Sequence, residues 1–239
     1  MAETWDAIVV GSGPNGLAAA ITLARAGCSV LVLEANSTIG GGARSAEFTL
    51  PGFVHDVCSA VHPLAAGSPF FQSLRLERFV LRWLQPEIPL AHPFDDGTAA
   101  CLYRELDLTA DSLGEDKRNY YRLMQPLVRD WQKLSVEFLQ PMLHLPRHPI
   151  ALAKFGMRAL CPTTLLMNLF FKSNQARTLF GGIAAHSFLP LERPVSSAFA
   201  FVLGSAGHTR SAGQFRTADR NQFRTRSPRA FKNSVATSS

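Results

Sequence analysis

The sequence lacks several patterns that mark common classes of protein. It has four cysteines in 239 residues and no Cys-x-x-Cys pair, which argues against a zinc ribbon or a dithiol redox motif. It also has no Gly-x-Ser-x-Gly, the turn that carries the nucleophile of many hydrolases. Its longest apolar stretch, residues 159–171, is shorter than the roughly 20 residues that cross a bilayer. The first residues, MAETWDAIVV, carry acidic side chains where a secretory signal carries basic ones. We therefore expect a cytoplasmic protein with reduced thiols and no transmembrane segment.

An excess of positive charge is missing from most of the chain. The formal net charge is +6, yet residues 1–207 carry equal numbers of basic and acidic side chains. The imbalance comes from seven basic residues and one acidic residue in 208–239. We expect no nucleic-acid partner for residues 1–207, whereas the basic segment could bind anions.

The first 50 residues predict a strand, a helix and a second strand. The run AIVV is continuously apolar, as in a strand that is buried on both faces. Residues 14–26 repeat apolar side chains at helical spacing, and Gly27 follows as a helix stop. A second apolar strand is expected over residues 29–34. Two parallel strands joined by a helix form a right-handed crossover.

A glycine fingerprint lies where the first strand meets the helix. Gly11 permits the tight turn, Gly13 lets the backbone approach a diphosphate, and Gly16 lets the helix pack against the strand. The helix N-terminus offers free N–H groups to the phosphates. Glu34 ends the second strand and can accept hydrogen bonds from ribose hydroxyls, while its charge would repel the 2′-phosphate of NADP. The alternative is a glycine-rich turn that holds no ligand. The predicted cofactor-binding residues here are Gly11, Gly13, Pro14, Asn15, Gly16 and Glu34.

A double glycine separates FAD from NAD as the expected dinucleotide. Gly40 and Gly41 follow Glu34 in the segment EANSTIGGGARS. This segment resembles the signature of FAD-binding oxidoreductases of the amine oxidase and phytoene desaturase type. In those proteins the glycines pass close to the flavin nucleotide, and an arginine often follows them directly. Here Gly42 stands at that arginine position and Arg44 lies two residues further on, so Gly40, Gly41 and Arg44 complete the predicted cofactor site.

The resemblance to the phytoene dehydrogenase-like branch covers roughly residues 5–208. It rests also on LPGFVHDVCSAVHP, on DDGTAACLYRELDLTADSLGEDKRNYYRL and on FGGIAAHSFLPLERPVSSAFAFVLGSAGH. It implies an α/β fold in which a Rossmann-like βαβ unit for FAD precedes part of an α+β substrate domain. We predict the FAD unit over residues 1–50, the partial substrate domain over 51–207, and a disordered basic tail over 208–239.

The same resemblance predicts a truncated chain. Members of the family are about twice as long, and a second glycine-rich segment near their C-terminus holds the flavin ring. Here the family pattern ends at AGH and an Arg-, Ser- and Thr-rich composition replaces it. A frameshift in GC-rich DNA would produce such a change, and the alternative is a native basic arm. In a truncated chain we expect an incomplete parallel sheet with exposed edges and apolar faces.

The substrate domain is predicted to contain short strands and then helices. Strands are expected over residues 79–84 and, after a turn at Asp95-Asp96-Gly97, up to residue 104. Residues 109–139 predict a helix that Pro126 kinks, residues 140–150 a bend, and residues 151–190 further helix.

No catalytic residue emerges from the sequence. His55, His62, His186 and His208 have no partner spacing typical of a metal site or a catalytic triad, so we assign them structural or surface roles. Asp56 could approach the flavin side, in a loop after the double glycine.

The function that these patterns favour is FAD-dependent dehydrogenation of a lipophilic or isoprenoid-type substrate, by hydride transfer to the flavin. The protein could lie at the periphery of a membrane, and its oligomeric state is left open. Two alternatives also stay open: a non-catalytic remnant or dinucleotide-binding fragment, and an NAD-dependent dehydrogenase.

Overall fold

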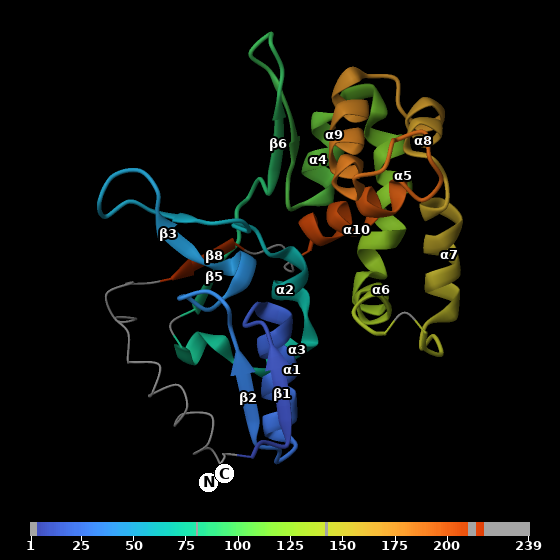
Figure 1. The fold of residues 1–239 in the computed structure, drawn as a ribbon. Coiled ribbons are helices and arrows are strands. Elements are labelled where there is room, and N and C mark those ends of the chain that lie inside the picture. Colours follow the sequence, from blue (N-terminus) through green and yellow to red (C-terminus); the bar gives the residue numbers. More distant parts are fainter. Residues whose placement is uncertain (1–3, 80, 142, 210–213, 218–239) are drawn as a thin grey trace. The chain divides into compact units, whose positions relative to one another are not determined.

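A computed structural model describes residues 4–79, 81–141, 143–209 and 214–217. The chain divides into two compact units: one contains the residues up to Ala60, and the other runs from Val61 to Arg216. Figure 1 labels the helices and strands of each unit.

The first unit begins with the predicted strand, helix and strand. They are β1 (Ala7–Val10), α1 (Pro14–Arg25) and β2 (Val30–Leu33). The two strands are parallel, with Ala7 opposite Val30 and Val10 opposite Leu33. The helix stops where the sequence predicts, because Gly27 has a φ of 89° and donates its N–H to Ala24 O at 3.0 Å.

The expectation that β1 is buried on both faces is wrong. Its side chains alternate, and Ile8 and Val10 are 59% and 82% exposed. The reason is that β1 and β2 pair only with each other within the described residues, and α1 covers one face of this pair (Figure 1). The other face presents apolar side chains, as in a sheet to which further layers are normally added.

The end of the first unit is a small antiparallel hairpin. A 3-10 turn, η1 (Gly41–Ala43), leads from β2 into β3 (Ser45–Glu47), which pairs with β4 (Val54–Asp56).

The second unit opens with short elements. These are α2 (Pro63–Gly67), α3 (Pro69–Ser73), η2 (Leu76–Phe79), β5 (Leu81–Leu84), β6 (Leu90–Pro93) and β7 (Ala99–Leu102). β6 and β7 form an antiparallel hairpin, and β5 pairs with β8 (Gln214–Thr217).

Helices make up the rest of the second unit. They are α4 (Leu106–Ser112), η3 (Gly114–Asp116), α5 (Lys117–Arg129), α6 (Trp131–Phe138), α7 (Pro149–Ala159), α8 (Thr163–Phe170), α9 (Asn174–Ala184), η4 (Ala185–Ser187) and α10 (Ser197–Gly207). α10 packs against α5, α7 and α9 (Figure 1). Two glycines of α10 allow its neighbours to approach closely. A Cβ on Gly204 would lie 2.9 Å from Met124 Cε of α5, and a Cβ on Gly207 would lie 2.4 Å from Leu102 Cδ2 of β7.

The predicted helix over residues 109–139 is divided into several helices. Pro126 lies inside α5, and the break follows it at Asp130, which donates its N–H to Pro126 O at 3.2 Å. The bend over residues 140–150 ends at Pro149, which begins α7. α10 lies beyond the region for which the sequence predicts helix.

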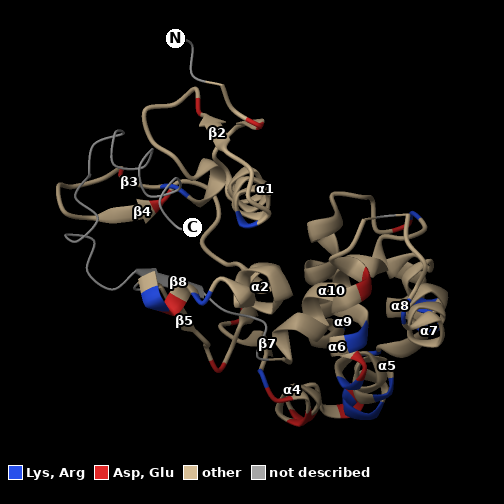
Figure 2. Cartoon of the chain, turned by 90° about the horizontal axis from the view of Figure 1, so that it is seen from below, with Lys and Arg blue, Asp and Glu red and all other residues tan. Residues whose placement is uncertain are grey.

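The helices α4 and α5 carry charges of opposite sign. Figure 2 colours acidic positions on α4 and basic positions on α5. Lys117 forms an ion pair with Asp111 there, and both side chains are more than half exposed.

Within the described residues, no single helix has the length and apolar composition needed to cross a membrane. One pair of helices, α7 and α8, meets those two criteria only when taken together, and it is bent by 87°.

The predicted tail over 208–239 falls largely outside the described residues. Of the part that the structure describes, His208 is buried against the helices and residues 214–217 form β8. The frameshift and the domain boundaries stay predictions.

Candidate functional site: a dinucleotide cradle

The turn from β1 into α1 has the conformation that the glycine fingerprint predicts. Gly11 has a φ of 95°, which favours glycine, and its N–H donates to Leu33 O at 2.7 Å. A Cβ on Gly16 would lie 2.1 Å from Gly11 O, so no larger residue fits without moving the backbone. Because Gly16 has no Cβ, the first turn of α1 can lie close to the end of β1.

The double glycine packs against the fingerprint. A Cβ on Gly41 would lie only 2.9 Å from Gly13 Cα, and a Cβ on Gly13 would lie 3.9 Å from Gly41 Cα. The N–H of Gly40 donates to Ser12 O at 3.1 Å, and Gly40 has a φ of 113°. Two glycine segments that are far apart in sequence thus meet at the N-terminus of α1.

The N-terminus of α1 carries no side-chain cap. Gly13 is its N-cap residue, Pro14 takes the first helical position, and no acidic residue lies in the first turn. Asn15 follows Pro14 and is exposed. The first N–H groups of a helix have no partner within the helix, and together with the helix dipole they favour an anion.

Glu34 lies just after β2 and its carboxylate reaches the glycine turn. Its Oε2 accepts hydrogen bonds from Ser12 N at 2.9 Å and Ser12 Oγ at 2.6 Å. Its Oε1 accepts from Asn36 N at 3.0 Å and Asn36 Nδ2 at 2.7 Å. The hydrogen bond from the Ser12 side chain is the largest of the effects that hold the pKa of this carboxyl far below its usual range. Glu34 is therefore a carboxylate at any physiological pH.

Arg44 folds back onto the double glycine. Its Nε donates to Gly41 O at 2.9 Å, and the side chain is half-buried. The guanidinium forms no ion pair with another described residue. A fixed positive charge beside this turn suits a phosphate.

The structure brings the predicted cofactor residues together within the first unit. Gly11, Gly13 and Gly16 form the turn, Gly40 and Gly41 close over it, and Glu34 and Arg44 flank it. Asp56 lies in the β3–β4 hairpin instead, where it accepts a hydrogen bond from Ser45 Oγ at 3.0 Å.

Ser12 is a functional residue that the sequence motifs did not indicate. It is 1% exposed, it donates twice to Glu34, and its backbone oxygen receives Gly40 N–H. A small hydroxyl residue between two fingerprint glycines is the signal that could have pointed to it, since its neighbours have no side chain.

These residues fit the adenosine and diphosphate half of a dinucleotide. Two glycine segments meet beside an uncapped helix N-terminus, and the Glu34 carboxylate is bound to the same turn, which is the residue pattern of a dinucleotide site. Within the described residues, no group of three or more His, Cys, Asp or Glu side chains could hold a metal ion.

Comparison with known proteins agrees with this geometry. Residues 9–74 match the family model of an NAD(P)-binding Rossmann-like domain. Hydroxyneurosporene desaturase of Cereibacter sphaeroides is 30% identical over 198 residues, which is 75% of this chain and 38% of that protein. The chain therefore contains a match to a dinucleotide-binding Rossmann-like domain, and it is similar to a desaturase over 75% of its length.

Two further relatives extend the comparison. A limonene dehydrogenase chain of Castellaniella defragrans is 28% identical over 136 residues, which is 57% of this chain and 24% of that protein. The structure of putrescine oxidase bound to putrescine shares the fold, with a TM-score of 0.55 and 22% identity over 88% of this chain and 46% of that one. The chain thus spans less than half the length of these three relatives.

Proposed function

We propose that the cradle of the first unit binds the adenosine and diphosphate half of FAD, and that the protein serves the dehydrogenation of a lipophilic, isoprenoid-type substrate. Bound FAD supplies the hydride acceptor in such a reaction. The observation that carries the proposal is the close approach of Gly41 to Gly13 beside the uncapped N-terminus of α1.

Each residue of the cradle has a binding role in this proposal. The N–H groups of Asn15 and Gly16 face the diphosphate, and Arg44 adds a positive charge beside it. Glu34 accepts hydrogen bonds from the adenosine ribose. Because Asn36 is exposed and its amide holds Oε1, a ribose hydroxyl can replace that one bond without disturbing Ser12.

The substrate class is inferred from the relatives. Two of them are named for limonene and hydroxyneurosporene, which are isoprenoid compounds. The protein's part in such a reaction is to hold the reacting bond at the flavin and to exclude water. We assign no catalytic residue.

The direct test is titration of the purified protein with FAD, NAD+ and NADP+. We expect FAD to bind and NADP+ to bind at least tenfold more weakly than NAD+, because Glu34 repels the 2′-phosphate. Glu34→Gln should raise the dissociation constant of FAD about tenfold, since hydrogen bonds to a charged group are lost.

Asp6 provides a matched control for Glu34. Its carboxylate also accepts from a serine, with Ser29 N at 2.8 Å and Ser29 Oγ at 2.6 Å, but it lies at the other end of β1. Asp6→Asn should leave FAD affinity unchanged. Equal losses in the two variants would mean that a general effect on folding, and not ribose binding, explains the result.

A second function is a dinucleotide-binding fragment without catalysis. The observation that favours it is that the residues of the cradle all lie in the first unit. Bound FAD that no isoprenoid donor reduces under anaerobic conditions would support it. Tight NADH binding without any affinity for FAD would instead support a nicotinamide-dependent dehydrogenase.

A further inference from the structure

The second unit contains a cavity of about 490 Å³ that the cradle does not use. Its walls come from the residues before and within α2, the β6–β7 hairpin, the junction of α9 and η4, and α10. Apolar side chains dominate the lining, among them Leu90, Leu102, Ile183, Phe199 and Leu203. A cavity of this size and character is typical of sites for small organic ligands.

The charges of the lining limit what the cavity can hold. Among the residues that the structure describes, no aspartate, glutamate, lysine or arginine lines it, and the titratable side chains of the lining are His62 and His186. An ammonium group would find no carboxylate partner, and burying an unpaired charge is strongly unfavourable. The cavity therefore selects against amines, which need a counter-ion.

His186 presents a hydrogen-bond acceptor rather than a donor. Its Nδ1 lies 3.3 Å from Gly182 O, and because a carbonyl can only accept, Nδ1 carries the proton. In the neutral imidazole Nε2 then has a lone pair and no hydrogen. His186 forms no ion pair with a carboxylate among the described residues.

A second imidazole lies close to the same glycine. The His92 ring packs against Gly182, where a Cβ would lie 2.4 Å from His92 Cε1. Burial and the neighbouring His186 both lower the pKa of His92. Because no lysine or arginine of the described residues lines the cavity, a ligand carboxylate finds no fixed positive charge there.

The geometry points to a binding site for a neutral apolar alcohol, whose hydroxyl donates to His186 Nε2 while its hydrocarbon chain fills the space between α2, the β6–β7 hairpin and α10. The volume corresponds to roughly 16 groups of the size of a water molecule, at about 30 Å³ each. An isoprenoid alcohol of ten to fifteen carbons matches this space. The claim that such an alcohol is the substrate class rests on the proposed function. The claim that the cavity binds an apolar alcohol does not depend on it.

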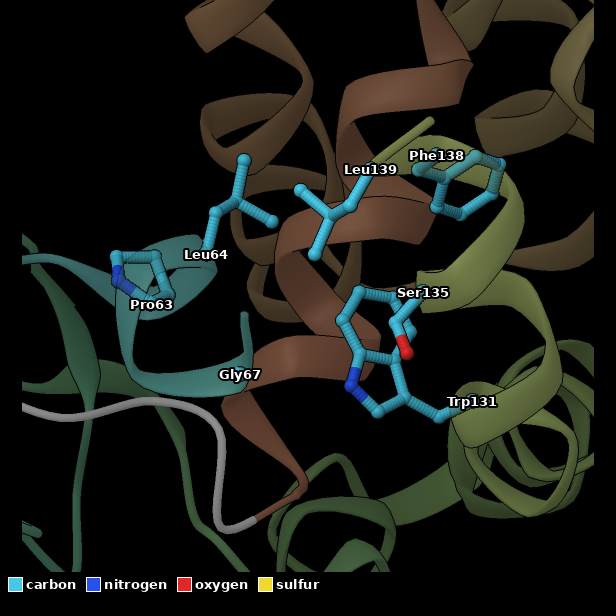
Figure 3. Close-up of a pocket in the computed structure, with 7 residues that line it drawn as sticks. All are labelled: Pro63, Leu64, Gly67, Trp131, Ser135, Phe138 and Leu139. Atoms are coloured by element: carbon cyan, nitrogen blue, oxygen red, sulfur yellow. The ribbon is translucent and has the colours of Figure 1, made fainter. Parts of the chain in front are cut away.

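The cavity shares part of its lining with a second, much smaller space. Pro63 and Leu64 of α2 line both the cavity and a crevice of about 10 Å³, which is far smaller than the cavity. Figure 3 shows Leu64 and Leu139 on facing sides of this crevice, with Trp131 below them. Movement of α2 into the crevice would enlarge the cavity for a longer chain.

The test uses four probes that share one carbon skeleton: geraniol, geranic acid, geranylamine and the hydrocarbon 2,6-dimethyl-2,6-octadiene. Binding to the full chain is measured by saturation-transfer NMR and calorimetry at pH 8, without added FAD. We expect geraniol to bind about fivefold more tightly than the hydrocarbon, as one net hydrogen bond provides. The acid and the amine should bind at least tenfold more weakly than geraniol.

Three variants locate the site. His186→Phe should abolish the preference for geraniol over the hydrocarbon, and His186→Gln should retain part of it, because a glutamine oxygen can accept. Ala65→Phe places a ring into the cavity from α2 and should reduce binding of both probes at least tenfold. Ala66→Phe is the matched control, since Ala66 is not part of the lining.

The inference is overturned if no probe binds, if the acid or amine binds best, or if Ala65→Phe and Ala66→Phe behave alike with native circular dichroism. FAD binding is measured separately by absorbance on the same variants. In the unaltered protein, FAD binding without alcohol binding contradicts the cavity assignment alone, and alcohol binding without FAD binding contradicts the cradle alone.

Discussion

Tyr120 and His208, which are 88 residues apart in sequence, share a buried hydrogen bond of 2.9 Å between the tyrosine hydroxyl and the imidazole Nε2. His208 Nδ1 lies 3.3 Å from Arg104 O, so Nδ1 carries the proton and Nε2 accepts from Tyr120. Burial lowers the pKa of His208 to about 4 and raises that of Tyr120. The pair therefore fastens the end of α10 to α5 as a neutral hydrogen bond.

This pair predicts that the second unit loses stability in mild acid. The pKa of His208 is lower in the folded state than the usual 6.5, so the unfolded chain takes up the proton first. The free energy of unfolding should fall as the pH drops from about 6.5 to 4, by up to roughly 3 kcal/mol. Urea unfolding at a series of pH values measures this, and His208→Gln should flatten the curve over that interval.

Tyr120→Phe should destabilise the second unit by about 1–3 kcal/mol, because it leaves the buried Nε2 of His208 without a donor. Tyr121→Phe is the control, since Tyr121 is adjacent in sequence and 39% exposed. The midpoint of urea unfolding compares the two variants. Equal midpoints would contradict a structural role for the buried pair.

Gly16→Ala should abolish FAD binding. The new Cβ would lie 2.1 Å from Gly11 O, so either the turn or α1 must shift away from the diphosphate. Gly42→Ala is a close control, because its Cβ would meet Cys58 at ordinary distances of 3.7 and 3.8 Å. Quenching of FAD fluorescence gives both affinities, and a Gly16→Ala variant that binds like Gly42→Ala would disprove the cradle.

Ser12→Ala and Asn36→Ala should have different effects on FAD affinity, although both remove hydrogen bonds to Glu34. Ser12 is buried and positions the carboxylate against the turn, so its loss should weaken binding several-fold. Asn36 is exposed and occupies the oxygen that the ribose would use, so its loss should leave affinity unchanged or improve it. A weaker affinity in Asn36→Ala would mean that Asn36 orients Glu34 instead.

The glycine turn of the cradle could be predicted from sequence because its glycines are required for local reasons. Position 16 must be glycine because a Cβ there would collide with the backbone oxygen of Gly11. Position 11 favours glycine because its φ is positive, so the spacing of these glycines indicates the turn. The strand, helix and strand around it follow from apolar period and turn residues.

What sequence could not predict depends on contacts between distant segments. The composition of β1 predicts burial on both faces, but composition does not say whether a second layer covers a strand. The division of the predicted long helix and the position of α10 depend on packing against other helices, which a periodic pattern does not contain. The histidine environments were beyond prediction for the same reason, since His92 meets His186 only through tertiary contacts.

The most buried carboxylate of the second unit gives a last prediction. Asp116 is fully buried and accepts hydrogen bonds from Lys172 N, Ser173 N and Ser173 Oγ, where α9 begins. Burial opposes its ionisation, but the hydrogen bonds from Ser173 and Lys172 outweigh burial and lower its pKa. Its stabilising effect is therefore complete above the ordinary aspartate pKa of about 3.9 and is lost as the pH falls below it.

Asp116→Asn should destabilise the second unit by about 2–3 kcal/mol at pH 7, because an amide NH₂ would then face backbone donors. Asp111→Asn is the matched control, since Asp111 forms its ion pair with Lys117 in solvent and such pairs contribute little. Chemical unfolding followed by circular dichroism compares the two. If both variants unfold at the same denaturant concentration, the N-terminus of α9 does not depend on the buried carboxylate.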